Sequence, residues 1–143
     1  METVKFYEQV DDGKLSFAVI IAKTGGKWVF CKHRDRETYE VPGGHREIGE
    51  TILETAKREL NEETGAIEFD IKPICVYSVK SNASMAKNDE SFGMLFYAEI
   101  VSFGDFHSEI EKILITDTLV DKWTYPHIQP KLMEEARQRG FLR

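Results

Sequence analysis

The side chains that could carry chemistry lie together in the segment from Arg58 to Glu63. On an α-helix, Glu59, Glu62 and Glu63 would stand at positions i, i+3 and i+4, so their carboxylates would project from one face. Carboxylates this close repel one another unless a cation lies among them. Arg58 supplies one positive charge. A divalent ion that prefers oxygen ligands, such as Mg²⁺ or Mn²⁺, would supply the rest.

The stretch from Thr51 to Gly65 carries the signals that begin and end a helix. Thr51 with Glu54 fits a capping box, and Gly65 stands where a left-handed residue closes a helix. The face opposite the carboxylates is an apolar stripe made of Ile52, Leu53, Ala56 and Leu60. We therefore expect a helix that packs this stripe on a core and turns its acidic face to solvent or a cleft.

Two glycines, Gly43 and Gly44, precede this helix and allow the backbone to come close to a ligand. A metal ion that bridges phosphate oxygens can neutralise developing charge and lower the pKa of a bound water. A nearby carboxylate can then accept a proton from that water. Together these parts predict hydrolysis of a phosphoanhydride bond. The alternative, a merely solvated acidic helix, requires neither the glycines nor Glu50 at fixed offsets.

Residues 44–66 resemble the Nudix box of the Nudix hydrolases. The pattern is Gly44, five residues, Glu50, seven residues, and then Arg-Glu-Leu-x-Glu-Glu-x-Gly-Ala, with Val-Pro-Gly-Gly at 41–44 as the usual lead-in. Ala66 departs from the larger aliphatic residue that ends most such boxes. The resemblance implies an α/β/α sandwich, with a mixed β-sheet between helices, and a metal-dependent enzyme.

The resemblance also implies roles for single residues. The implied metal ligands are Gly43, through its carbonyl, Glu59, Glu62 and Glu63. The implied catalytic residues are Glu50, Arg58, Glu59 and Glu62. Arg58 would orient the carboxylates, with Glu50 as its partner. The general base differs among Nudix proteins: it is a box glutamate in some and a later glutamate in others, for which Glu109 and Glu111 are candidates here.

Residues outside the box would hold the remainder of the substrate. The candidates for substrate binding are Phe92, Glu109, Glu111, Asp117 and Trp123, with Tyr77, Met85 and Phe96 as further stacking surfaces. An aromatic residue in a strand more often belongs to the core, and Asp117 more often belongs to a turn.

Segments 26–28, 33–36 and 123–126 resemble the MutT-like branch of small Nudix proteins. The resemblance implies a nucleoside triphosphate substrate, including an oxidised purine nucleotide, split into monophosphate and pyrophosphate. ADP-ribose, nucleotide sugars and dinucleoside polyphosphates are alternatives in the same reaction class. A nucleotide-sensing module without catalysis is a second class of function, and RNA decapping is a third.

The composition favours a small-molecule substrate. The chain has 143 residues and a net charge of −6, which argues against broad binding of a nucleic-acid polymer. No apolar run approaches the length of a membrane span. Two isolated cysteines, Cys31 and Cys75, without a signal peptide indicate reduced, buried thiols in a cytoplasmic protein. Cys31 and His33 share one face of a strand, and we interpret them as ordinary side chains. We expect a monomer or homodimer.

The elements that must position these groups can be read from hydrophobic patterns. We expect strands over residues 1–10, 15–22, 27–33, 92–103 and 110–114, one long or two short strands over 67–81, a loop over 82–90, and a second helix over 129–139. The apolar run at 15–22 is typical of a buried central strand, and Pro73 should fall at a break or an edge. Mixed, largely local connections indicate one α+β, or mixed α/β, domain spanning residues 1–143.

Overall fold

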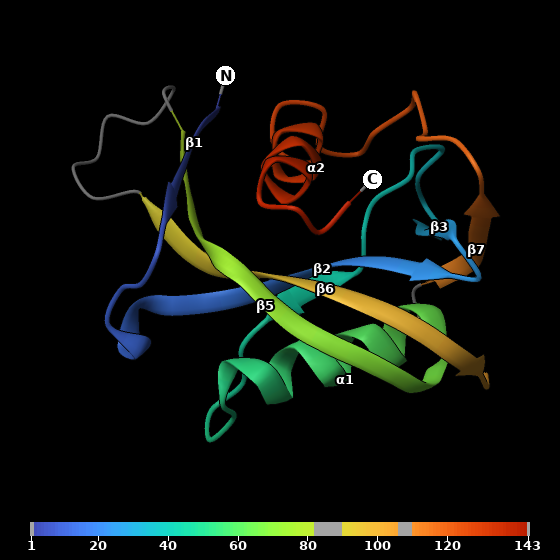
Figure 1. The fold of residues 1–143 in the computed structure, drawn as a ribbon, viewed down its shortest axis with the longest axis horizontal. Coiled ribbons are helices and arrows are strands. Elements are labelled where there is room, and N and C mark those ends of the chain that lie inside the picture. Colours follow the sequence, from blue (N-terminus) through green and yellow to red (C-terminus); the bar gives the residue numbers. More distant parts are fainter. Residues whose placement is uncertain (1, 82–89, 106–109, 143) are drawn as a thin grey trace.

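The computed structural model describes residues 2–81, 90–105 and 110–142, which form a mixed sheet of seven strands between two α-helices (Figure 1). The strands are β1 (Glu2–Tyr7), β2 (Leu15–Thr24), β3 (Lys27–His33), β4 (Gly43–His45), β5 (Ala66–Ser81), β6 (Ser91–Phe103) and β7 (Ile110–Thr116). The helices are α1 (Ile52–Thr64) and α2 (Gln129–Gln138), and a 3-10 turn, η1 (Asp12–Lys14), precedes β2. The predicted α+β architecture is confirmed.

The sheet has the order β1-β5-β6-β2-β3-β7, and the short strand β4 pairs with β2. Strands β2 and β6 are parallel, while the other pairs are antiparallel. Figure 1 shows α1 and α2 on opposite faces of this sheet. The apolar run at 15–22 lies in β2, between β6 and β3, so the prediction of a buried central strand is confirmed.

Successive residues of β2 point to opposite faces, and each face has its own core. Ile20 packs with Leu60 of α1, whereas Ile21 packs with Leu132 of α2. The first core lies under the acidic helix. The second lies on the face that carries the cleft described below.

Helix α1 begins and ends where its capping residues predict. The Thr51 side chain accepts a hydrogen bond from the Glu54 N–H at 3.1 Å, and the Glu54 carboxylate accepts one from the Thr51 N–H at 2.8 Å. Gly65 closes the helix with a φ of 79°. A left-handed residue is readily supplied by glycine, so the local sequence fixes both ends of α1.

The apolar stripe of α1 is only partly buried, whereas the sequence predicted that the whole stripe packs on the core. Ala56 and Leu60 are fully buried, but Leu53 is 38% exposed, so its predicted place in the core is wrong. The helix is turned toward β4, and the buried arc therefore includes the polar side chains of Glu59 and Glu63 in place of Leu53.

Leu60→Ala is expected to lower the free energy of unfolding by about 2–5 kcal/mol, because it leaves a cavity in a fully buried site. Chemical denaturation measures this loss. Leu53→Ala, on the same helix, is the matched control and should cost less than about 1 kcal/mol. Equal losses in the two variants would contradict the orientation of α1.

Strand β5 is a single long strand, one of the two alternatives that the sequence left open. Its pairing with β6 shifts register between Pro73 and Cys75. Strand β1 covers β5 only from Val76 to Ser81, so Pro73 lies where the other side of β5 has no strand partner within the described ranges. A proline lacks the N–H that a central strand requires, which explains its place here.

Helix α2 carries Pro130 in its first turn, and Gly140 follows the helix with a φ of 88°, as predicted. Cys31 and Cys75 are buried and unpaired with each other. Residues 82–89, within the predicted loop, lie outside the described residues. No helix in the described ranges is long and apolar enough to cross a membrane.

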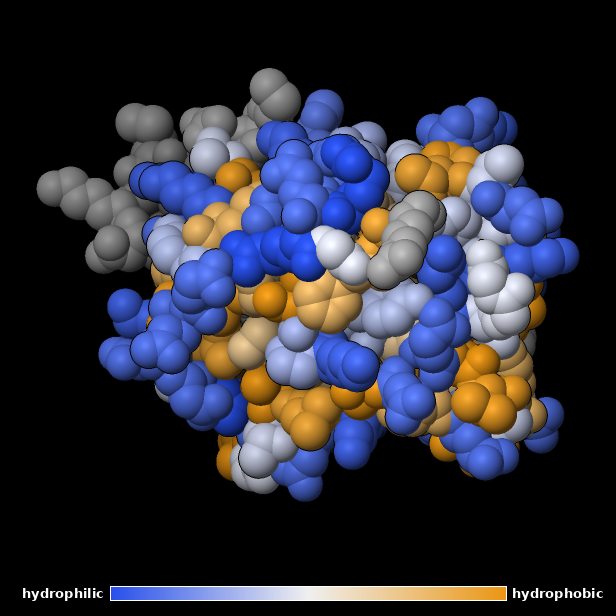
Figure 2. All heavy atoms as spheres, viewed as in Figure 1, coloured by the Kyte–Doolittle hydropathy of each residue, from blue (hydrophilic) through white to orange (hydrophobic). Residues whose placement is uncertain are grey.

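Figure 2 shows the hydropathy of the face seen in Figure 1, where apolar residues reach the surface in small groups between hydrophilic ones. Such small groups are ordinary on protein surfaces. Cavities and charged clusters are therefore the better guide to function.

Candidate active site

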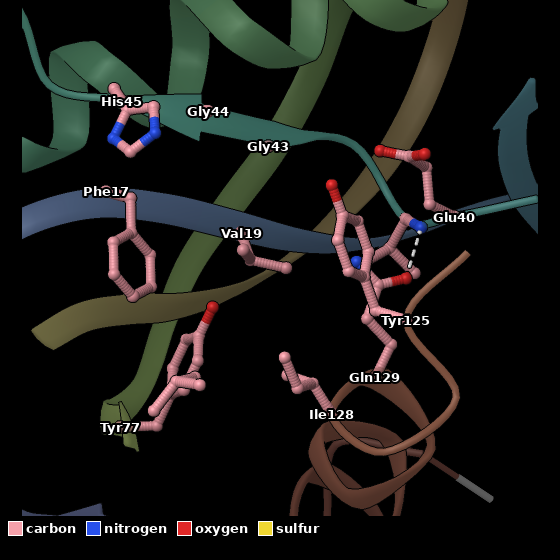
Figure 3. A pocket seen from close by; sticks show the side chains of 12 residues that line it. Phe17, Val19, Glu40, Gly43, Gly44, His45, Tyr77, Tyr125, Ile128 and Gln129 are labelled. Carbon is pink, nitrogen blue, oxygen red and sulfur yellow. Dashed lines mark hydrogen bonds between the residues drawn. The ribbon is translucent and has the colours of Figure 1, made fainter. Parts of the chain in front are cut away.

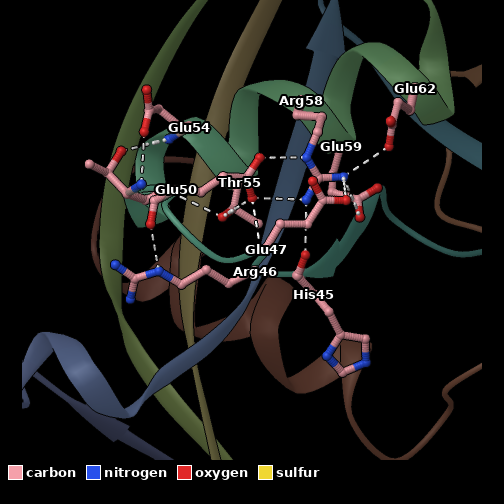
Figure 4. Close-up of polar contacts among 10 residues, drawn as sticks. His45, Arg46, Glu47, Glu50, Glu54, Thr55, Arg58, Glu59 and Glu62 are labelled. Carbon is pink, nitrogen blue, oxygen red and sulfur yellow. Dashed lines mark hydrogen bonds and ion pairs between the residues drawn. The ribbon is translucent and has the colours of Figure 1, made fainter.

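Arg58 connects the acidic helix to the loop and strand that precede it (Figure 4). Its guanidinium donates two hydrogen bonds to the Glu50 carboxylate, at 2.6 and 3.0 Å, and one to the His45 carbonyl at 2.9 Å. It also donates to Glu62 at 3.0 Å and lies 3.4 Å from Glu59. One cation thus contacts three of the glutamates singled out in the sequence.

The charges of these glutamates respond to their surroundings in different ways. The hydrogen bond from Arg58 lowers the pKa of Glu50 to about 2. Burial raises the pKa of Glu59 to about 7, although Arg58 lowers it in part. Burial raises the pKa of Glu63 to about 8, against the opposing hydrogen bond from Gly43. The carboxylates of Glu59 and Glu63 are therefore largely removed from water, and the positive charge near them does not compensate for the lost hydration.

Strand β4 lies directly against these two carboxylates. The Gly43 N–H donates to Glu63 Oε1 at 2.8 Å. A Cβ atom at Gly44 would lie 1.7 Å from Glu59 Oε2, so the glycine leaves room for that carboxylate where it lies. A Cβ atom at Gly43 would lie 2.6 Å from the Ala18 carbonyl oxygen, so this glycine permits the pairing of β4 with β2.

The carboxylate cluster fits a divalent cation in donor type and charge. Carboxylate oxygens are the ligands that Mg²⁺ and Mn²⁺ prefer, and the buried negative charge exceeds what Arg58 neutralises. No group of three or more His, Cys, Asp or Glu side chains within the described ranges is already arranged around a metal position. Glu62 is instead held by Arg58, and Glu63 by the Gly43 N–H.

A second group of side chains lies against Glu63. His33 Nε2 is 3.4 Å from Glu63 Oε2 and also 3.4 Å from Glu40 Oε2. Cys31 Sγ lies 4.0 Å from Glu63 Oε1, and burial, with Glu63 as the next cause, raises the pKa of its thiol well above the usual range. The shared strand face of Cys31 and His33 was predicted, but their contact with the box was not. The place of Glu40 in this group could not be predicted, because its only distinguishing feature in the sequence is its position just before the Val-Pro-Gly-Gly lead-in.

A cleft opens on the other side of β4, on the face covered by α2 (Figure 3). It has a volume of about 210 Å³. Strand β4 and Glu40 border it, and its walls include Phe17, Val19, Tyr77, Tyr125, Ile128 and Gln129. The same two glycines therefore border both the carboxylate cluster and an open cavity. This arrangement can place a phosphate chain near the carboxylates and a second group in the cleft.

Most of the predicted substrate-binding residues lie elsewhere. Trp123 packs edge-to-face on Phe30 at 5.5 Å, and Phe92 packs on Tyr7 at 5.6 Å. Neither of these residues lines the cleft, and Phe96 is buried in the α1 core.

The charged candidates also lie outside the cleft. Glu111 forms an ion pair with Lys32 at 3.0 Å, and Asp117 is exposed in the turn after β7. Glu109 and Met85 lie outside the described residues. Of the residues named from sequence for substrate binding, Tyr77 alone among the described ones lines the cleft.

The metal-free protein is expected to lose stability as pH rises from about 5 to about 9. Glu59 and Glu63 titrate near 4.5 in an unfolded chain but have pKa values of about 7 and about 8 in the folded protein. The folded state therefore binds more protons between these values. Its stability contribution is complete below pH 4.5 and is lost as pH rises through 7 and 8. Melting temperatures measured in a chelator test this, and the slope should flatten in Glu59→Gln/Glu63→Gln. An unchanged slope in that variant would contradict the assignment.

A mixed sheet between two helices, with a glycine strand laid over an acidic helix, defines an α/β/α sandwich with a carboxylate site at the edge of a cleft. Residues 13–123 match the family model of the NUDIX domain, and the chain belongs to this family.

Similar proteins agree with this classification. Over 60 residues, the chain is 45% identical to YtkD of Bacillus subtilis (strain 168), which is provisionally named an 8-oxo-dGTP diphosphatase. The match covers 42% of this chain and only 37% of the length of that relative. The Bacillus subtilis pyrophosphohydrolase BsRppH, in a mutant form, has a similar structure, with a TM-score of 0.80 and 24% identity over 99% of this chain and 93% of that one. A NUDIX hydrolase from Nitrosomonas europaea has a TM-score of 0.69 and 18% identity, over 87% and 90% of the two chains.

Proposed function

We propose that the chain hydrolyses a phosphoanhydride bond in a substrate that contains a nucleoside diphosphate, with Mg²⁺ or Mn²⁺ as its cofactor. The preferred substrate is a nucleoside triphosphate, including an oxidised purine nucleotide, which is split into monophosphate and pyrophosphate. One observation carries this proposal: Gly43 and Gly44 lie between the buried carboxylates of Glu59 and Glu63 and an open cleft.

The cation would be held by Glu59, Glu62, Glu63 and the Gly43 carbonyl. When bound, it would neutralise charge on the phosphate oxygens and lower the pKa of a bound water. Arg58 keeps Glu50 ionised, and it holds the end of β4 against the helix through the His45 carbonyl. Its role is therefore to position the box glutamates.

The proposed general base is Glu59, with Glu62 as the alternative within the box. Glu59 lies directly against Gly44 of β4, one of the two glycines that border the cleft, so its carboxylate is close to where the phosphate chain would lie. Glu62 is more exposed, with 48% of its side chain accessible, and is engaged by Arg58. Among the later candidates, Glu111 is engaged by Lys32, and Glu109 remains an alternative.

The oxidised purine nucleotide is supported by the partial similarity to YtkD. ADP-ribose, nucleotide sugars and dinucleoside polyphosphates are the alternative substrates for the same reaction. All of them contain the diphosphate that the carboxylate cluster would act on, and they differ in the group that would enter the cleft.

The test is hydrolysis of a substrate panel by the purified protein with Mg²⁺. The panel contains ordinary and 8-oxo nucleoside triphosphates, ADP-ribose, nucleotide sugars and dinucleoside polyphosphates, and the products are separated by chromatography. Activity that is lost in Glu63→Gln supports the proposal, and the products identify the bond cleaved. If no member of the panel is hydrolysed but one of them still raises the melting temperature, the protein is a nucleotide-sensing module and not an enzyme.

A further inference from the structure

His33 contacts the Glu63 carboxylate from outside the acidic helix. It is the last residue of β3, and its Nε2 lies 3.4 Å from Glu63 Oε2. The other oxygen of this carboxylate, Oε1, accepts the hydrogen bond from the Gly43 N–H at 2.8 Å. Groups from two different strands therefore approach the two oxygens of Glu63. A carboxylate offers about four lone-pair sites, so these contacts leave sites for a cation.

Glu40 lies on the other side of the His33 imidazole. Its Oε2 is also 3.4 Å from His33 Nε2. Figure 3 shows the Glu40 carboxylate directed toward the face of the sheet that carries α1, away from Gln129. The main chain of Glu40 pairs with Cys31 through two hydrogen bonds, at 2.9 and 3.0 Å, and its carboxylate accepts one from Arg36 at 2.9 Å. Glu40 is therefore fixed through both its backbone and its side chain.

The imidazole separates two carboxylates that would otherwise repel each other. Burial is the largest cause that raises the pKa of Glu63, and the negative charge of Glu40 is among the further causes. Without a donor between them, this repulsion favours rotation of the Glu63 carboxylate away from Glu40. The side chains of His33, Glu40 and Glu63 are only 18%, 9% and 13% accessible, so water has little room to replace the imidazole.

We propose that His33 is a positioning residue that fixes the orientation of the Glu63 carboxylate for the divalent cation, and that Glu40 holds His33 in place. Outer partners of a ligating carboxylate orient it, and the loss of one typically weakens metal binding by about 10-fold to 100-fold. His33 and Glu40 lie outside residues 44–66, so part of the support for the cation comes from outside the Nudix box. The inference rests on the proposed function, because it concerns the cation of that reaction.

Two amide substitutions at one position test this inference. The NH₂ of a glutamine reaches about as far as His Nε2, whereas that of an asparagine reaches only as far as Nδ1. The Kd for Mn²⁺, measured by calorimetry without substrate, should rise about 10-fold to 100-fold in His33→Asn and stay within about 3-fold of wild type in His33→Gln. Thermal melting in a chelator checks that both variants are folded, and His33→Ser replaces the asparagine variant if that one is not. His127→Asn changes an exposed histidine and should leave the Kd unchanged.

Electron paramagnetic resonance of bound Mn²⁺ distinguishes a positioning residue from a ligand. An imidazole that binds Mn²⁺ directly produces a nitrogen coupling, which should be absent in the wild-type protein. That coupling, an unchanged Kd in His33→Asn, or equal losses in the asparagine and glutamine variants would overturn the inference. If the wild type binds Mn²⁺ and hydrolyses a substrate while His33→Asn keeps its Kd, only this inference fails. If the wild type binds no Mn²⁺, the proposed cofactor fails as well.

Discussion

Glu63→Gln is expected to lower kcat by about 10²-fold to 10⁴-fold while the protein remains folded. Glu63 is proposed to hold the divalent cation, and charge stabilisation by such a cation contributes several kcal/mol to a transition state. A glutamine oxygen can still accept the hydrogen bond that the Gly43 N–H donates at 2.8 Å, so the contact with β4 survives. The substitution also removes a buried carboxylate from a group that repels it, which should preserve or raise the stability of the metal-free protein.

Steady-state kinetics and thermal melting of the same preparation test this prediction. Glu134→Gln is the control, because Glu134 forms its ion pair with Arg137 on the surface of α2 and takes no part in the carboxylate cluster. Glu62→Gln should lose activity in the same way as Glu63→Gln. Near-normal turnover in both box variants would refute the metal assignment.

Arg58→Lys is expected to reduce kcat/KM by about 100-fold or more, although it keeps the positive charge. The guanidinium holds Glu50 through two hydrogen bonds while it also reaches Glu62 and the His45 carbonyl. One ammonium group cannot reproduce this planar fork. The box carboxylates would then lose their fixed positions, and a misplacement of about 1 Å at a reacting centre costs about 100-fold. The free energy of unfolding should fall by about 1–2 kcal/mol, since the site is partly solvated.

The pH dependence gives this variant a distinctive signature. The hydrogen bond from Arg58 lowers the pKa of Glu50 to about 2 in the wild-type protein, from an ordinary value of 4.5. In Arg58→Lys this pKa should rise, and so should the pKa of Glu59, the proposed base, which Arg58 also lowers, so the acidic limb of the pH–rate profile should move to higher pH. Arg137→Lys alters a surface arginine paired with Glu134 and serves as the control. A profile that does not move would show that Arg58 acts only in folding.

The helix and its carboxylates could be predicted because their signals are local. Thr51, Glu54 and Gly65 fix the ends of α1 within a few residues of themselves. The spacing of the glutamates fixes which face they share. The exposure of Leu53 could not be predicted, since it depends on how far the helix turns toward β4, and that is a contact between segments.

The cleft could not be predicted because it is assembled from separate strands. Phe17 and Tyr77 are 60 residues apart and meet only because β6, with Gly93, lies between β2 and β5. Trp123 was an equally reasonable aromatic candidate from sequence. Its packing on Phe30 follows from the order of the strands, which hydrophobic patterns do not specify.

Strand β4 alone separates the carboxylate cluster from the cleft. The groups proposed to hydrolyse the substrate belong to α1 and its preceding loop, whereas β2, β5 and α2 contribute walls of the cleft, and Gly43 and Gly44 border both. The two halves can therefore change separately. Substitutions at positions 17, 77 and 129, which line the cleft, should therefore change its shape without altering the carboxylates.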